Sequence, residues 1–203
     1  MKFILIVCTG RSGSTTLQRI ISTLPNSNIT GEKAGAISHI LKSYKSLKIT
    51  TSHHIKNKKK PAWYNTFNIE LVKQKIKRLI LSILDNKEGN KIVGFKDINY
   101  YNQNNIYILD EFLKLFPNTK IICHIRDPLS QSKSGWMKNK PNSLNKLEKS
   151  NEYLKQYAKQ NTNCYLSHFE HLFKIEEIKK LGEFLGETFN EKEYYDIINN
   201  NLG

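Results

Sequence analysis

The chain has 203 residues and is poor in cysteine and in acidic side chains, and it contains no long apolar run. Three cysteines cannot all pair with one another, and none has the spacing of a zinc site, so we expect buried, reduced thiols. The apolar run at residues 2–8 is too short for a membrane span or for the usual layout of a signal peptide. The sequence therefore predicts a soluble protein, cytoplasmic or otherwise intracellular, without a membrane-spanning segment.

The shortage of acidic side chains gives the chain a large positive charge. Asp and Glu number 18 against 32 Lys and Arg, for a net charge of +14. Such an excess favours an anionic partner: a nucleotide, a nucleic acid, or a sulfated or phosphorylated polymer. No recognised nucleic-acid motif accompanies the charge, so a specific nucleic-acid partner is not expected. The hydrophobic content of 38% and the length together predict one folded domain over residues 1–203.

Apolar runs rich in Ile and Val alternate with amphipathic stretches along the chain. The runs predict strands at residues 2–8, 91–96, 119–125 and 163–167. The amphipathic stretches predict helices at residues 15–24, 32–47, 68–86, 105–116, 128–138, 145–160, 171–186 and 190–200. This alternation indicates an α/β protein with a P-loop-like, three-layer fold, in which helices flank a central parallel sheet.

Residues 48–66 interrupt this alternation and are expected to form an exposed basic loop. They contain the run KNKKK at 56–60 and then Pro61. A solvated loop and a docking patch both fit such a lysine run.

The stretch VCTGRSGSTTLQRII, residues 7–21, has the pattern of a strand, an anion-binding loop and a helix start. Gly10 and Gly13 allow the backbone to approach an anion, and the first turn of the helix points its amides at it. Arg11 is the nearby cation. Three hydroxyl side chains follow and add donors: Ser14, Thr15 and Thr16. No lysine precedes these hydroxyls, which disfavours a nucleoside triphosphate with magnesium, although a P-loop kinase or ATPase and a plain helix cap remain alternatives.

A second polar segment, HIRDPLSQSKSGW, follows the strand at 119–125. Arg126 comes directly after that strand, and Ser134 is expected about two turns into the next helix. An arginine at a strand end can bind a phosphate through two nitrogens, and a nearby hydroxyl can complete the site. Pairing of Arg126 with Asp127 is the structural alternative.

GRSGSTTL followed by RDPLSQSKS resembles the two nucleotide-binding elements of the sulfotransferases that use 3′-phosphoadenosine 5′-phosphosulfate (PAPS). NITGEKAGAI at 28–37 is similar to a segment of the protein-tyrosine and carbohydrate branch, and LSHFEHLF and GEFLGETFNE are similar to later family stretches. Residues 48–90 match nothing identifiable. The resemblance implies that Arg126 and Ser134 hold the 3′-phosphate. It implies that the 5′-phosphosulfate is held by Arg11, Ser12, Gly13, Ser14, Thr15 and Thr16.

The resemblance also implies an in-line transfer of a sulfuryl group to a hydroxyl. Glu32 is the candidate base, and Asp97 is the second choice. Lys96, with Arg11, is the candidate cation for the charge that builds on the leaving phosphate. Cytosolic members usually carry a histidine two residues after the lysine, where this chain has Ile98. The structural alternatives are a helix-start carboxylate for Glu32 and an ion pair with Asp97 for Lys96.

PAPS is thus the expected donor and the desulfated nucleotide PAP the product, with no metal required. The acceptor is a hydroxyl compound: an acidic glycan, a tyrosine flanked by acidic residues in a peptide, or a small molecule. An inactive PAP- or PAPS-binding protein of the same fold is the alternative function.

Overall fold

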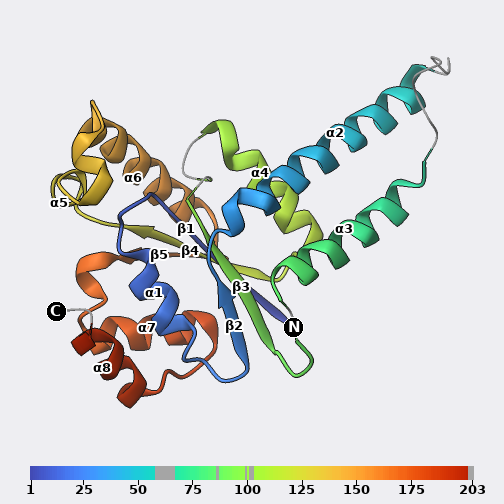
Figure 1. Cartoon of the computed structure of the whole chain (residues 1–203). Coiled ribbons are helices and arrows are strands. Elements are labelled where there is room, and N and C mark those ends of the chain that lie inside the picture. The colour runs from blue at the N-terminus through green and yellow to red at the C-terminus, as the bar shows by residue number, and fades with distance from the viewer. Residues whose placement is uncertain (58–66, 86, 99, 101–102, 201–203) are drawn as a thin grey trace.

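The computed structural model describes residues 1–57, 67–85, 87–98, 100 and 103–200 (Figure 1). The strands are β1 (Lys2–Cys8), β2 (Ser27–Thr30), β3 (Ile92–Asp97), β4 (Thr119–Ile125) and β5 (Cys164–His168). The helices are α1 (Ser14–Ile21), α2 (Ala36–Asn57), α3 (Ile69–Ile83), α4 (Gln103–Leu115), α5 (Pro128–Ser132), α6 (Ser143–Gln160), α7 (Ile175–Leu185) and α8 (Glu191–Asn200). Three 3₁₀ turns complete the described elements: η1 (Lys33–Gly35), η2 (Gly135–Asn139) and η3 (Phe169–His171).

The five strands form one sheet in the order β2-β3-β1-β4-β5, and every neighbouring pair is parallel. β1 lies in the centre, where Ile6 pairs with Lys96 of β3 and with Ile122 of β4. The chain leaves β1 toward β2 and β3 on one side and later crosses to β4 and β5 on the other. A ligand is expected at the carboxyl ends of strands beside such a reversal.

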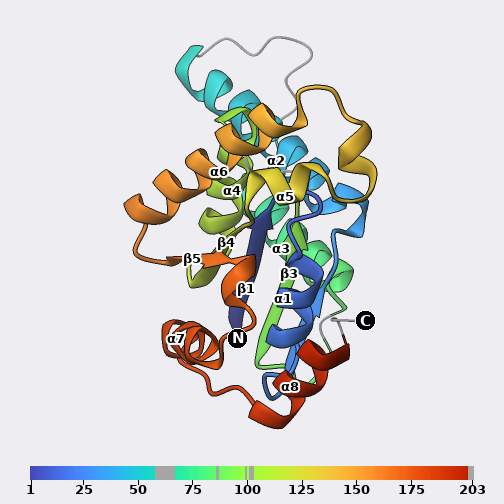
Figure 2. The same cartoon turned by 90° about the vertical axis from the view of Figure 1, so that its left-hand side faces the viewer.

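Alternating residues of β1 face two separate hydrophobic clusters, as the period of a strand requires. Phe3, Leu5 and Val7 pack with α2, α3, α4 and α6, whereas Ile4 and Ile6 pack with α1, α7 and α8. Figure 2 shows these two sets of helices on opposite sides of the sheet. The predicted α/β fold with a parallel sheet between two helical layers is therefore confirmed.

Helices α2 and α3 lie side by side and extend together away from the sheet (Figure 1). The expected loop at 48–66 is wrong for its first ten residues, because α2 continues to Asn57. Tertiary contacts favour the longer helix: α2 packs against α3 and α4, and Lys48, the first residue beyond the predicted helix, forms an ion pair with Glu111 of α4. Residues 58–66 of the expected loop lie outside the described residues.

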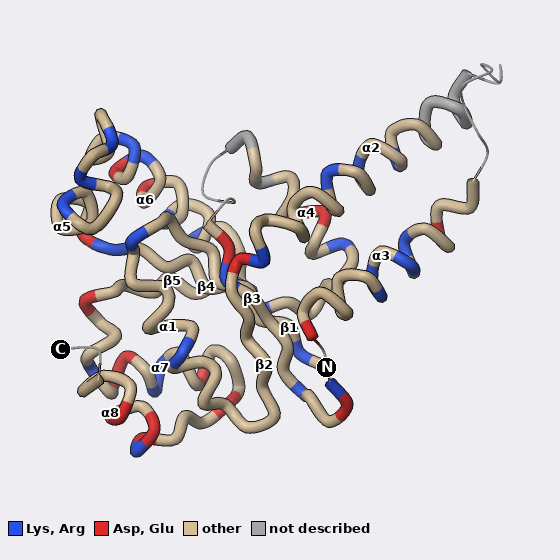
Figure 3. Tube along the Cα trace, viewed as in Figure 1, with Lys and Arg blue, Asp and Glu red and all other residues tan. Residues whose placement is uncertain are grey.

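Positive side chains occur along α2 and α3 and around α5 and the start of α6, so the excess charge is spread over several elements (Figure 3). In the part of the chain that the structure describes, no helix combines the length and the apolar character needed to cross a bilayer.

Candidate functional site

The loop between β1 and α1 contains two glycines, Gly10 and Gly13, that pack closely against aromatic rings. Gly13 also has a positive φ of 79°, as does Arg11 at 65°. A Cβ on Gly13 would lie 2.1 Å from Cδ2 of Phe169, and one on Gly10 would lie 2.6 Å from Cζ2 of Trp136. Neither position can take a larger side chain without moving an aromatic ring, so the two rings fix how closely the loop packs.

Gln131 of α5 holds the first part of this loop. Its side chain is fully buried, and Nε2 donates hydrogen bonds to the Gly10 carbonyl at 2.7 Å and to Oγ1 of Thr9 at 2.6 Å. The sequence analysis did not single this residue out. Its place inside the segment RDPLSQS, one turn after the cap of α5, is the only signal that the sequence offered.

His124 of β4 forms a hydrogen bond with the same loop. Its Nε2 lies 3.1 Å from the carbonyl oxygen of Ser12, which can only accept, so this nitrogen carries the proton. Nδ1 then accepts from the hydroxyl of Ser167 at 3.0 Å. Complete burial lowers the pKa of His124 to about 3. The imidazole is therefore neutral near pH 7 and serves as a structural donor to the loop.

Arg126 follows β4 and contacts the same loop. Its Nη1 donates to the carbonyl of Arg11 at 3.3 Å, and its guanidinium carbon lies 4.4 Å from the centre of the Phe169 ring. The carboxylate of Asp127 accepts from the backbone N–H of Ser130 at 2.7 Å and so caps α5. Three successive loop carbonyls, those of residues 10, 11 and 12, thus accept hydrogen bonds from side chains of β4, α5 and the turn between them.

Ser134 meets the loop through Arg11, whose Nε and Nη2 lie 3.4 and 3.3 Å from its Oγ. The expectation that Ser134 lies in a helix is wrong: α5 ends at Ser132, and Ser134 is extended at φ −95° and ψ 128°. Lys133 caps α5, Ser134 is the extended residue before η2, and η2 starts at Gly135, whose φ of +52° is unsuited to a continuing α-helix. Arg11 and Ser134, distant in sequence, nevertheless face each other.

Glu32 and Lys96 form an ion pair, with Oε1 of Glu32 2.7 Å from Nζ of Lys96. Glu32 precedes the turn η1, and Lys96 is the penultimate residue of β3. The side chain of Lys96 is 12% exposed and that of Glu32 is 35% exposed, so the pair is only partly open to solvent. Asp97, the second choice for a base, is fully buried and is absent from the described lining of the cavity.

These residues surround a cavity of about 510 Å³ at the carboxyl end of the sheet. Its described lining comprises Gly10, Arg11, Gly13, Ser14, Thr15, Thr16, Glu32, Lys96, Ile98, Arg126 and Trp136. Ser12 and Ser134, both predicted site residues, are not part of that lining, and the Ser12 side chain is fully buried. Three cations and one carboxylate among the described lining residues, together with the amides of a helix start, suit a ligand with more than one negative charge.

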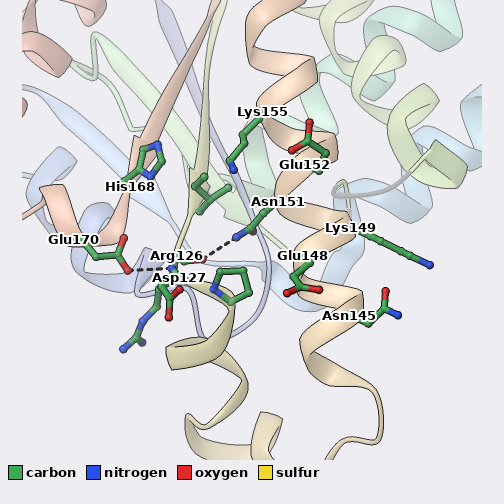
Figure 4. A pocket seen from close by; sticks show the side chains of 12 residues that line it. Arg126, Asp127, Asn145, Glu148, Lys149, Asn151, Glu152, Lys155, His168 and Glu170 are labelled. Carbon is green, nitrogen blue, oxygen red and sulfur yellow. Dashed lines mark hydrogen bonds between the residues drawn. The ribbon is translucent and has the colours of Figure 1, made fainter.

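Two further cavities adjoin this one. One, of about 660 Å³, shares Arg126 and is lined by residues of α6 and of the segments after β4 and β5 (Figure 4). In Figure 4 the guanidinium of Arg126 turns away from α6, while Nδ2 of Asn151 donates to the Arg126 carbonyl at 2.7 Å. The other, of about 280 Å³, shares Gly10, Ile98 and Trp136 with the central cavity. Among the described residues, no group of three or more His, Cys, Asp or Glu side chains is placed to hold a metal ion.

The sequence and the fold of the chain are both similar to those of sulfotransferases. Residues 4–191 match a family model described as the sulfotransferase family. The fold is similar to that of the sulfotransferase domain from the Synechococcus PCC 7002 olefin synthase, at 16% identity and a TM-score of 0.59, over 95% of this chain and 76% of that one. It is also similar to a sulfotransferase from Alicyclobacillus acidocaldarius, at 14% identity and a TM-score of 0.53, over 91% of this chain and 81% of that one. None of the curated proteins matches the sequence.

Proposed function

The chain belongs to the sulfotransferase family, and we propose that it transfers the sulfuryl group of PAPS to the hydroxyl of an acceptor. One observation carries this proposal. The loop after β1, which carries Arg11 but no lysine, lines the same cavity as the Glu32–Lys96 ion pair.

The charges of the cavity support PAPS as the donor. PAPS carries a phosphosulfate on one end of its ribose and a separate phosphate on the 3′-position. We assign the phosphosulfate to the loop of Arg11, Gly13 and the following hydroxyls, whose amides and side chains offer several donors. We assign the 3′-phosphate to Arg126 together with Ser134. Arg11 links the two proposed sites, because it belongs to the loop while its carbonyl accepts from Arg126 and its guanidinium contacts Ser134.

The Glu32–Lys96 pair supports a chemical role for both residues. PAPS supplies an activated sulfur whose bond to the bridging phosphate oxygen is broken in the reaction. Glu32 takes the proton of the acceptor hydroxyl as the hydroxyl oxygen bonds to that sulfur. The electron pair of the broken bond stays with the phosphate of PAP, and Lys96, with Arg11, stabilises the charge that develops there.

The same pair argues against the alternative of an inactive nucleotide-binding protein. A protein that only bound PAP would have no need of a carboxylate beside Lys96, since an acid weakens the binding of an anion. In this chain the carboxylate faces the lysine at 2.7 Å inside the cavity.

Calorimetric titration with PAP, with ATP and magnesium as competitor, tests the proposal. We expect PAP to bind and ATP at the same concentration to leave it bound, because the loop lacks the lysine of a triphosphate site. Displacement by ATP would favour a kinase or ATPase instead, and the absence of PAP binding would refute the sulfotransferase function.

A further inference from the structure

The cavity of about 280 Å³ lies beside the central one. Gly10, Ile98 and Trp136 line both cavities, so a molecule in the smaller cavity would lie next to the space that Glu32 and Lys96 line. The remaining described residues of the smaller cavity come from the end of β1, from η2 and its flank, and from α6: Thr9, Met137, Lys140, Ser143, Lys146, Leu147 and Ser150.

Apolar side chains form part of the wall of this smaller cavity. Ile98, Met137 and Leu147 belong to its described lining, and Met137 and Leu147 are buried. Trp136 is 47% exposed, an unusual state for so large a side chain in a folded protein, and its indole stands at the junction of the two cavities. A space below the range typical of drug-sized ligands, with an indole at its entrance, fits a flat group of about one ring.

The charged groups of the smaller cavity all have one sign. Its described lining contains two lysines, Lys140 and Lys146, and no acidic side chain. The ammonium of Lys140 lies 4.2 Å from the centre of the Trp136 ring, an interaction that keeps a positive charge at the edge of the apolar wall. The carboxylate nearest in the central cavity, that of Glu32, is already neutralised by Lys96.

The larger cavity beside Arg126 differs in this respect. Its described lining mixes bases with acids, including Lys149 and Lys155 with Glu148 and Glu152 (Figure 4). Such a lining has no preference for an anion, and the guanidinium of Arg126 turns away from α6. The smaller cavity is thus the one whose chemistry selects a ligand class.

We propose, on the premise of the sulfotransferase function, that the acceptor is a small molecule with a flat apolar body and an anionic group besides its reacting hydroxyl. The apolar body lies between Trp136, Ile98 and Leu147. The anionic group faces Lys140 and Lys146, and the hydroxyl reaches Glu32. The transfer forms the bond between the hydroxyl oxygen and sulfur, breaks the bond between sulfur and the bridging oxygen of PAPS, and passes the hydroxyl proton to Glu32.

Three probe acceptors with the same phenol ring and similar size test the charge: 4-hydroxyphenylacetate, its neutral amide and the cationic tyramine. We expect kcat/KM to decrease in that order, with the acid about five- to twentyfold better than the amide, as two partly exposed charge pairs allow. Lys140→Gln and Lys146→Gln should each lower the ratio of kcat/KM for the acid to kcat/KM for the amide. Lys138→Gln, an exposed lysine of η2 outside the described lining, is the matched control for the general positive charge.

PAP binding, measured in parallel, separates the two proposals. Equal rates for the three probes, or an advantage of the acid that Lys138→Gln removes as well as Lys140→Gln, would overturn the acceptor class. PAP binding without transfer to any of the probes, or transfer to a polymeric acceptor alone, would also overturn it and leave the donor site standing. Loss of PAP binding would instead refute the sulfotransferase function itself.

Discussion

Nζ of Lys96 lies 2.7 Å from Oε1 of Glu32, and both residues line the cavity at the carboxyl end of β3. Lys96 therefore pairs with an acid 64 residues earlier in the chain and not with its neighbour Asp97, which is fully buried. The pair joins the two residues that need opposite charges in the proposed reaction, a base and a cation, before any substrate is bound.

Replacing Glu32 by Gln should abolish proton transfer while preserving the hydrogen bond to Lys96. We expect kcat to fall by roughly a hundredfold or more, the usual contribution of a positioned base. The affinity for PAP should stay the same or rise, because a negative charge leaves the anion site. Steady-state kinetics with labelled PAPS, together with a PAP titration, measures both effects, and a variant with unchanged kcat would remove Glu32 from the mechanism.

Replacing Gln131 by Leu should loosen the anion-binding loop. The change removes the hydrogen bonds to the Gly10 carbonyl and to Oγ1 of Thr9 at a fully buried position. We expect a loss of about 1–3 kcal/mol in the free energy of unfolding and a weaker affinity for PAP. Gln160→Leu, at an exposed position near the end of α6, is the control.

Denaturant titration and calorimetry separate the two effects of the Gln131 change. Reduced stability with full PAP affinity would mean that Gln131 serves packing alone and does not position the loop.

His124 should make the folded state sensitive to acid. Its pKa is about 3 in the folded protein, chiefly because the ring is buried, against about 6.5 for an exposed histidine. Between about pH 6 and pH 4 the unfolded chain binds a proton that the folded chain does not, so this residue lowers stability as the pH falls, by up to about 1.4 kcal/mol per pH unit. In the His124→Gln variant, the free energy of unfolding should lose this part of its dependence on pH.

The measurement is the free energy of unfolding at several pH values between 4 and 6 for both proteins. His168 and the permanently charged Arg126 lie near the ring and are present in both proteins, so the difference between the two slopes reports chiefly the change at position 124. Equal slopes would show that His124 is protonated in the folded protein and does not donate from Nε2 alone.

The sequence predicted the residues of the candidate site that lie at the end of a strand or directly after it. Arg126 after β4 and Lys96 near the end of β3 had to lie at one edge, because carboxyl ends of parallel strands meet there. The three-layer fold followed in the same way from strands that alternate with helices. Strand β2 (Ser27–Thr30) was not predicted, since its four residues carry little apolar pattern and depend on pairing with β3.

The features that the sequence did not predict depend on contacts between distant residues. Helix α2 runs past Lys48, which pairs with Glu111 of α4, and Ser134 is extended and contacts Arg11 of the loop after β1. The role of Gln131 depends on which carbonyl its amide reaches. Local sequence periodicity does not encode such contacts, so they become visible only in the three-dimensional structure.

The most direct test of the proposed donor compares PAP with AMP, which lacks the 3′-phosphate, on the native protein and on Arg126→Ala. Calorimetry should find that the native protein binds PAP about ten- to a hundredfold more tightly than AMP, the worth of a charge-assisted contact. Arg126→Ala should lose most of that advantage while its affinity for AMP falls far less. Equal affinity of the native protein for the two nucleotides, or an equal loss of both in the variant, would contradict the assignment of the 3′-phosphate and with it the PAPS site.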